Sequence, residues 1–545
     1  MRRPRRMLLG LISTMLLCLL LGIAPITAQD AIDPPAPLRP LDLGPFAASI
    51  DGLTPSRIAQ LDELVLEATL ADLQAAMANG DLTSVELTTY YLSRINDLDV
   101  GGLQSMNELN PEALDIAAAL DAARAEGTVR GPLHGVPISL KDNIGTGDAM
   151  HTTAGAAALE DARSDQDASV AARLREAGAV LIGKANMTEW ANFMNQPGQA
   201  GYSALGGQVQ NVYDPALSPS GSSAGSAVGT SANLVAASIG TETEGSIIAP
   251  ATAAGIVGLK PSLGLVSRHR VIPITDQTDT PGPLTRTVAD AATLLTVIYG
   301  EDPADPTTID AAALAGTDFT TFLDPDALEG KRVGFFTGGT KADPDLTDEA
   351  YLAAIGFTEA VTGLQAAGAE VSVVWGDPLD NQEDFTGLGV IGLRDGVAAY
   401  LEATDPGGPI ASIADVVTFN AADPDRYAPF GQNVLEAAAE APEVSRDEYL
   451  AAGTQLREQA RDYLDALLAD NDLDVLVSSG NRLAGAYAVA GYPAITVPAG
   501  RLEGGTAAGL TFTGRHLEDG PLIGYAYAFE QASGLREPPP VVTGS

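Results

Sequence analysis

SPSGSSAGSAVGTSANLVAASIGTETEGSIIAP, residues 218–250, is the stretch around which the rest of the chain is arranged. It holds two clusters of small residues, 221–226 and 240–246, and the apolar run between them predicts one buried helix and the start of a strand. Glycine lets a backbone turn tightly or approach a neighbour closely. Two such clusters bring backbone N–H groups and serine hydroxyls to one place, as in an oxyanion-binding nucleophile site. The alternative is a pair of ordinary Gly/Ser loops.

The first 28 residues have the organisation of a secretory signal peptide. Four arginines within residues 2–6 precede an apolar run from Met7 to Ala24, and small residues follow up to Ala28. This order is typical of a cleaved export signal, so we expect cleavage after Ala28 and a secreted or periplasmic protein. A retained anchor is the alternative, because about 18 apolar residues suffice for a membrane span.

The composition excludes several classes of protein. The net charge is −41, from 30 basic and 71 acidic residues, and a chain this acidic repels nucleic acid and anionic membranes. The only cysteine, Cys18, lies in the predicted signal, so we expect neither a disulfide nor a cysteine nucleophile in the mature protein. The four histidines form no i,i+4 pair and no HExxH motif, so we predict no metal site and no cofactor.

Hydrophobic periodicity predicts an α/β fold. Residues 87–95 and 114–125 show helical stripes, and helices and strands alternate after residue 131. Strands are predicted at 136–140, 179–184, 332–336, 370–374 and 473–478, and helices at 168–177, 350–367 and 448–468. Such alternation favours a mixed central sheet covered by helices on both faces.

One large domain accounts for most of the chain. Residues 29–60 are rich in Pro and Asp and are predicted to be a linker, and residues 61–535 to be the catalytic domain. Within this domain, residues 378–445 are rich in Asp, Pro and Gly and have the composition of a variable insertion, and residues 536–545 are predicted to be a flexible tail.

A serine nucleophile needs a base within hydrogen-bond reach. One possibility is a Ser-His-Asp hydrolase, since residues 221–225 match the G-x-S-x-G elbow with Ser223 at its centre, and His269 and His516 follow downstream. The other possibility is lysine. Lys141 ends an apolar strand just before Asp142 and Asn143, and a buried lysine loses its proton more easily and then acts as a base. A solvated lysine at a strand end is the plainer alternative.

Several long motifs together resemble the amidase signature family. They are HGVPISLKDNI at 134–144, GKANMTEWAN at 183–192, GYSALGGQVQN at 201–211, SGSSAGSA at 220–227, GTETEGSIIAPA at 240–251, residues 257–291, AGYPAITVPAG at 490–500 and GYAYAFEQAS at 524–533. Their number and order make the resemblance specific. The TETEG sequence and the export signal are most similar to the secreted peptide amidase branch.

The resemblance implies a Ser-cisSer-Lys triad. By motif position, Ser246 is the nucleophile, Ser222 the bridging serine after a cis peptide bond, and Lys141 the final base. It also implies an oxyanion hole made by backbone N–H groups and a supporting loop next to the bridging serine. The oxyanion donors are expected on Thr243, Glu244, Gly245 and Ser246, and the supporting residues are Gly221, Ser223 and Gly225.

The resemblance also leaves specific points open. Glu244 stands where the family commonly has aspartate or glycine, and it would disfavour anionic substrates if it faced the pocket. Asp279 and Arg286 resemble scaffold residues that form an ion pair or anchor a loop. Trp190 and Phe193 line the substrate tunnel or pack in the core, and core packing is the more ordinary role.

The sequence therefore predicts a secreted amidohydrolase. Its substrate would be a small-molecule amide or a peptide C-terminal amide, with no metal, cofactor or nucleic-acid partner and no membrane contact after signal cleavage. Two alternatives remain: a Ser-His-Asp esterase that uses Ser223, and a non-catalytic exported solute-binding protein.

Overall fold

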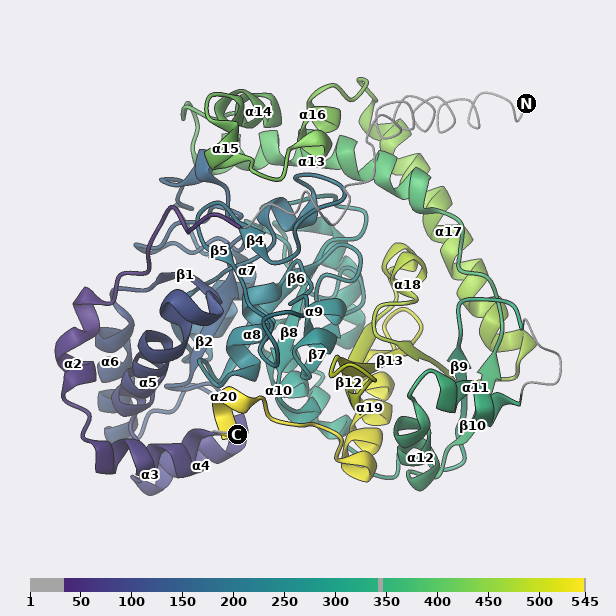
Figure 1. Cartoon of the computed structure of the whole chain (residues 1–545), viewed down its shortest axis with the longest axis horizontal. Coiled ribbons are helices and arrows are strands. Elements are labelled where there is room, and N and C mark those ends of the chain that lie inside the picture. The colour runs from purple at the N-terminus through teal and green to yellow at the C-terminus, as the bar shows by residue number, and fades with distance from the viewer. Residues whose placement is uncertain (1–33, 342–346, 544–545) are drawn as a thin grey trace.

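The computed structural model describes residues 34–341 and 347–543 (Figure 1). The predicted signal peptide, residues 1–28, lies outside the described residues. Within the described ranges, no helix is both long and apolar enough to cross a lipid bilayer.

Eleven of the strands between residues 106 and 513 form one continuous sheet. They are β1 (Met106–Leu109), β2 (Pro137–Lys141), β3 (Val180–Ala185), β6 (Ala237–Glu242), β7 (Val257–Lys260), β8 (Thr280–Thr285), β9 (Arg332–Phe336), β10 (Glu370–Val374), β11 (Val475–Ser479), β12 (Ala494–Arg501) and β13 (Ala507–Thr513). A separate two-stranded sheet is formed by β4 (Tyr202–Ser203) and β5 (Gly207–Gln208).

The α-helices divide into three groups along the chain. Before the sheet's central strands come α2 (Ala47–Asp51), α3 (Pro55–Val65), α4 (Leu70–Asn79), α5 (Ser84–Arg94), α6 (Ala113–Ala125) and α7 (Ser169–Glu176). The middle group is α8 (Ala224–Ser231), α9 (Ile248–Ala253), α10 (Val288–Ile298), α11 (Asp348–Ala354), α12 (Thr358–Ala366), α13 (Gln382–Thr404), α14 (Ile413–Ala421), α15 (Pro424–Tyr427) and α16 (Asn433–Ala439). The last group is α17 (Arg446–Asp470), α18 (Ala484–Ala490), α19 (Asp519–Ser533) and α20 (Pro540–Thr543).

The order of the large sheet is β1-β3-β2-β6-β8-β7-β12-β13-β11-β9-β10. Strands β3, β2 and β6 pair in parallel, as do β11, β9 and β10, while the strands between these groups pair antiparallel. Every residue of β2, β3, β6 and β8 is buried. Because neighbouring side chains point to opposite faces, both faces are covered, which confirms the predicted mixed α/β sheet.

The predicted linker differs from the structure in its second half. Residues 47–51 form α2, α3 begins at Pro55, and Phe46 is buried. Thr54 accepts a hydrogen bond from the Arg57 N–H, and proline suits the first helical position. The prolines and aspartates that suggested a linker therefore include a helix start.

Two further predictions need correction. The single helix predicted at 350–367 is two helices, α11 and α12, separated at Gly356, whose φ is +79°. The predicted flexible tail contains α20, and Arg536 forms an ion pair with Glu67 and donates to the Gly255 carbonyl. These contacts attach the described part of the tail to the body.

The predicted insertion, residues 378–445, is largely helical. Figure 1 shows α13, α14, α15 and α16 gathered at one end of the molecule, with α17 running from there toward β9 and β10. Buried apolar residues of α13 and α16 pack together in one cluster, which also includes Trp190. The insertion therefore forms a group of helices that pack on one another at this end of the molecule.

The first turn of helix α8 lies very close to the backbone of two other segments of the chain. The Gly225 N–H donates to the Asn186 carbonyl at 2.9 Å, and a Cβ at Gly225 would lie 2.2 Å from the Ser105 carbonyl oxygen. Only glycine fits so close to two backbone carbonyls. This contact fixes the start of α8 and so the position of the Gly/Ser cluster before it.

We predict that Gly225→Ala destabilises the protein by about 1–3 kcal/mol, because the added methyl group overpacks a rigid backbone contact. Gly229→Ala on the same helix is the matched control. A Cβ there would meet only the Ser105 side chain, with its hydroxyl oxygen at 3.2 Å, and the better helix propensity of alanine, about 1 kcal/mol, offsets that contact. Thermal unfolding monitored by circular dichroism compares the two; equal melting temperatures would contradict the prediction.

Candidate active site

Lys141 ends β2, an interior strand of the sheet, and is fully buried. Its Nζ donates to Ser222 Oγ at 2.7 Å and to the Thr241 carbonyl at 3.0 Å. Burial lowers the Lys141 pKa to about 7, and the negative charges of Asp279 and Glu242 act in the opposite direction. Desolvation penalises the ammonium form. A lysine in this state is partly neutral near pH 7 and is suited to accept a proton from a hydroxyl group.

Ser222 lies between Lys141 and the loop that carries Ser246. The Gly221–Ser222 peptide bond is cis, and the Ser222 side chain is fully buried. The next residue, Ser223, donates its N–H to the Ser246 carbonyl at 3.1 Å. The two Gly/Ser clusters of the sequence therefore meet in space.

Ser246 lies in the turn between β6 and α9. The turn passes through Gly245 with φ +79°, and the Ser246 residue is 7% exposed. Among the described residues, none accepts a hydrogen bond from the N–H of Glu244, Gly245 or Ser246. These donors, which precede helix α9, are available to an anionic oxygen.

Sequence reasoning missed Glu242, which stabilises this turn. Its Oε2 accepts the N–H groups of Ile247 at 2.8 Å and Ile248 at 3.0 Å. Glu242 is fully buried, and a carboxylate that accepts the free N–H groups at a helix start fixes the chain entering that helix. The signal was an acidic residue a few positions before the apolar start of α9.

Asp142 and Asn143 do not contact the Lys141 amine. Asn143 Nδ2 donates to Thr241 Oγ1 at 3.0 Å, and the Thr241 carbonyl accepts from Lys141. Asp142 Oδ2 accepts from Asn107 Nδ2 at 2.9 Å. Asn143 therefore acts on Lys141 through Thr241, and Asp142 holds the loop after β2.

Asp279 and Arg286 anchor loops, and they do not form an ion pair with each other. Asp279 accepts from Thr243 Oγ1 at 2.6 Å and from the N–H groups of Ile274 and Thr275 at 2.8 and 2.9 Å. Arg286 donates to backbone carbonyls, including that of Val235 at 3.1 Å. Burial raises the pKa of Asp279 to about 6, so its carboxylate is mainly ionised at neutral pH.

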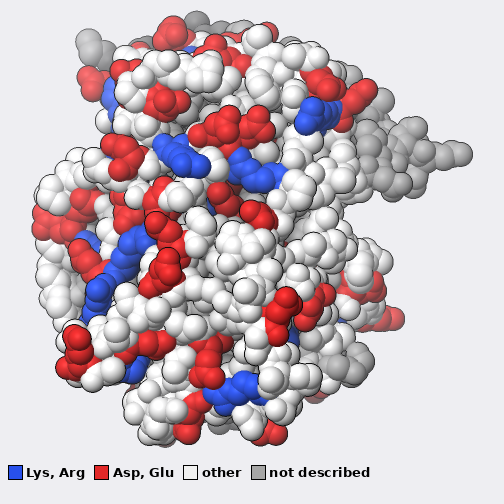
Figure 2. Space-filling model, turned by 90° about the vertical axis from the view of Figure 1, so that its left-hand side faces the viewer, with Lys and Arg blue, Asp and Glu red and all other residues white. Residues whose placement is uncertain are grey.

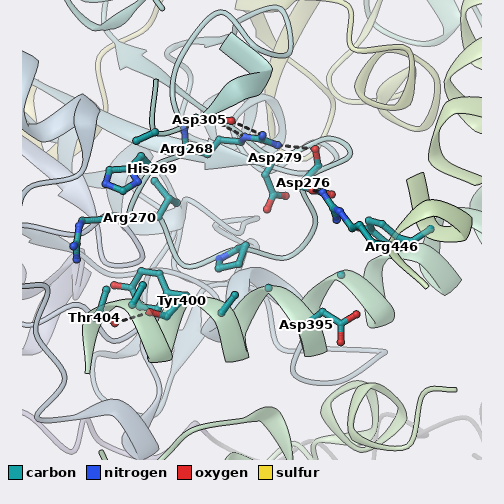
Figure 3. A pocket seen from close by; sticks show the side chains of 18 of the residues that line it. Arg268, His269, Arg270, Asp276, Asp279, Asp305, Asp395, Tyr400, Thr404 and Arg446 are labelled. Atoms are coloured by element: carbon teal, nitrogen blue, oxygen red, sulfur yellow. Dashed lines mark hydrogen bonds and ion pairs between the residues drawn. The ribbon is translucent and has the colours of Figure 1, made fainter. Parts of the chain in front are cut away.

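Figure 3 shows the loop of Asp279 from a neighbouring pocket of about 530 Å³. Arg268 pairs with Asp305 at 2.9 Å, and Arg446 at the start of α17 pairs with Asp276. These ion pairs hold the outer side of the loop, while Asp279 connects its inner side to Thr243.

A cavity of about 680 Å³ opens beside Ser246. Its apolar lining includes Phe193, Ile274, Phe385, Val390 and Val434, and its polar lining includes Asn192, Gln196, Thr243, Glu244, Gln382, Asn433 and Glu436. Glu244 thus faces the cavity. Trp190, in contrast, is 2% exposed within an apolar cluster. The insertion supplies much of the cavity wall from α13 and α16.

The Ser-His-Asp alternative is not supported by the geometry. Ser223 is fully buried and donates its hydroxyl to the Thr241 carbonyl at 3.1 Å. His516 Nδ1 lies 3.1 Å from the Gly491 carbonyl oxygen, and His269 lines the pocket of Figure 3. Among the described residues, no group of three His, Cys, Asp or Glu side chains is arranged to hold a metal ion.

Comparison with known proteins identifies the family. The amidase family model matches residues 86–484. A probable amidase of Arabidopsis thaliana is 38% identical over 480 residues, which cover 87% of this chain and 92% of the relative.

Solved structures agree. Native peptide amidase from Stenotrophomonas maltophilia is 42% identical with a TM-score of 0.79, over 87% of this chain and 98% of that chain. The peptide amidase PAM in complex with the competitive inhibitor chymostatin is also 42% identical, with a TM-score of 0.78 over 87% of this chain and 99% of that chain. An amidase family protein from Bacillus anthracis str. Ames is 34% identical with a TM-score of 0.83, over 91% and 97%. The chain therefore belongs to the amidase signature family and is an amide C–N hydrolase similar to peptide amidases.

Proposed function

We propose that the protein hydrolyses carboxamide bonds, in peptide C-terminal amides or small amides, by a Ser-cisSer-Lys acyl-enzyme mechanism. The observation that carries this proposal is the 2.7 Å hydrogen bond from the buried Lys141 amine to Ser222. Family membership removes support for the alternative of a solute-binding protein without catalytic activity.

In the proposed reaction, Ser246 Oγ attacks the amide carbonyl carbon, and its proton passes through Ser222 Oγ to the neutral Lys141 amine. The backbone N–H groups of residues 243–246 stabilise the negative oxygen that develops on the carbonyl. The C–N bond then breaks as the relay returns the proton to the leaving nitrogen. Water attacks the resulting ester in the same way, which releases the acid and frees Ser246.

Two observations support a peptide amide as the substrate class. The cavity at Ser246 combines apolar walls with amide side chains, a lining that suits a peptide. A relative of 42% identity binds chymostatin, a peptide-like competitive inhibitor.

We also infer from residues 1–28 that the protein is exported and cleaved after Ala28. Sequencing the N-terminus of the exported protein would show Gln29 first; an intact Met1 would contradict this inference.

Lys141→Ala is expected to lower kcat for a neutral peptide amide by at least about 100-fold, because general-base catalysis contributes about 10²–10⁴-fold. Lys331→Ala, a change at a less buried lysine outside the cavity lining, is the matched control. Ammonia release measures both rates, and circular dichroism checks that both variants are folded. Near-normal hydrolysis by folded Lys141→Ala would remove lysine from the mechanism.

A fluorophosphonate probe is expected to label the wild-type protein at Ser246, since this serine lines the cavity. Ser246→Ala should abolish the label. Ser223→Ala should retain it, because the Ser223 hydroxyl is fully buried and bonded to a backbone carbonyl. Mass spectrometry of the labelled peptide identifies the site; a label that disappears with Ser223→Ala alone would support the elbow hydrolase instead.

Asp279→Asn is expected to move the acid limb of the kcat/KM profile to lower pH. The Asp279 charge favours the ammonium form of Lys141, so its removal lowers the Lys141 pKa below about 7 and keeps the base neutral at lower pH. Asp276→Asn is the control, since that carboxylate pairs with Arg446 on the outer side of the same loop. A limb that stays in place or moves to higher pH with Asp279→Asn would contradict the assignment.

A further inference from the structure

The cavity beside Ser246 has an unbalanced charge. Its lining includes two carboxylates, Glu244 and Glu436, and no Lys, Arg or His. The two carboxylates come from different walls: Glu244 precedes Ser246 by two residues, and Glu436 lies in the first turn of α16. The cavity beside Ser246 is therefore lined by negative groups and by no positive group.

Glu244 is the inner of these two groups and is partly buried. The Gln382 amide, at the first residue of α13, donates to its Oε2 at 3.3 Å. Among the described residues, Glu244 has no cationic partner, and burial raises its pKa. A carboxylate removed from water is stabilised by a cation that pairs with it. Glu244 therefore lines the cavity as an acid that no cation of the described chain pairs with, and a cation on the substrate would stabilise it.

Glu436 is the outer group and is exposed. Its only recorded side-chain partner within the described chain is the Gln432 amide, at 3.4 Å. The protein as a whole is strongly negative, at −41. On the face drawn in Figure 2, the basic side chains lie dispersed among acidic ones. A field of this sign draws cations toward a concave site and repels anions.

The apolar walls suit the rest of a basic side chain. Phe193, Ile274 and Phe385 line the same cavity. The methylene stem of an arginine or lysine packs on apolar surface while its charged end reaches a polar group. The carboxylates of Glu244 and Glu436 provide that polar group.

Building on the proposed function, we propose that this cavity selects amides that carry a guanidinium or ammonium group near the scissile carboxamide, with Glu244 as the main specificity residue and Glu436 as a weaker one. A peptide amide that ends in a basic residue fits this description. An acidic residue at the same place would meet two like charges and be rejected.

The test compares Nα-benzoyl-arginine amide with Nα-benzoyl-citrulline amide, which has nearly the same shape and no charge. Binding is measured by calorimetry to Ser246→Ala, so that the result does not depend on hydrolysis. We expect the arginine amide to bind at least about tenfold more tightly, because only the guanidinium group adds an opposite charge to its hydrogen bond with the carboxylate. Adding Glu244→Gln should bring the ratio of the two dissociation constants close to one. Adding Glu436→Gln should reduce it less.

Glu440→Gln is the matched control, because Glu440 directly follows the same helix α16 and does not line the cavity. This change should leave the ratio unchanged, and a fall there equal to that with Glu436→Gln would show a general charge effect and overturn the role of Glu436. Equal binding of both amides by Ser246→Ala would overturn the proposal. So would a preference that Glu244→Gln leaves undiminished.

Hydrolysis of both amides by the wild-type protein distinguishes a failure of the cation subsite from a failure of the proposed amide hydrolysis. A binding preference without any hydrolysis supports the cation subsite and contradicts the proposed amide hydrolysis. Hydrolysis of both amides at equal kcat/KM, with equal binding, contradicts the subsite alone.

Discussion

The hydrogen bond from Lys141 to Ser222 constrains the rest of the structure. It requires a buried amine at the end of an interior strand and a serine from a distant segment directly against it. Burial lowers the cost of deprotonating the amine, and two carboxylates limit the fall of its pKa. The environment therefore keeps the pKa of Lys141 at about 7, which suits the proposed role of an amine that takes up a proton and returns it.

The sheet order explains how this contact forms. Strand β2, which ends in Lys141, is flanked by β3 and β6, and β6 leads directly into the turn that contains Ser246. Helix α8, which follows the Ser222 segment, packs against β2 and β6. Asp279, just before β8, holds the turn through Thr243. Three neighbouring strands thus bring Lys141 together with Ser222, 81 residues later in the sequence, and with the turn that holds Ser246.

Much of this arrangement was predictable from local patterns. The helix stripe through Leu87 and Tyr91, the strand that ends at Lys141 and the helix after the first Gly/Ser cluster all agree with the structure. The pairing of β12 with β7, by contrast, depends on residues more than two hundred positions apart, and no local pattern encodes it. Residues 378–445 were predicted only as an insertion, because their Asp, Pro and Gly mark helix ends and turns without showing which helix faces will pack together.

Burial and a lowered pKa do not by themselves identify the base. Lys184 and Lys260 are also fully buried, and desolvation lowers the pKa of both, that of Lys260 to about 8. Lys260 donates to two backbone carbonyls, and Lys184 to a carbonyl and to Thr152, so neither amine contacts a serine next to the cavity. Lys141 alone among these three lysines donates to a serine hydroxyl, that of Ser222, whose segment is hydrogen-bonded to Ser246 at the cavity wall. What distinguishes the proposed base is therefore the group that its amine contacts, since the sheet interior gives all three lysines a similar loss of solvent.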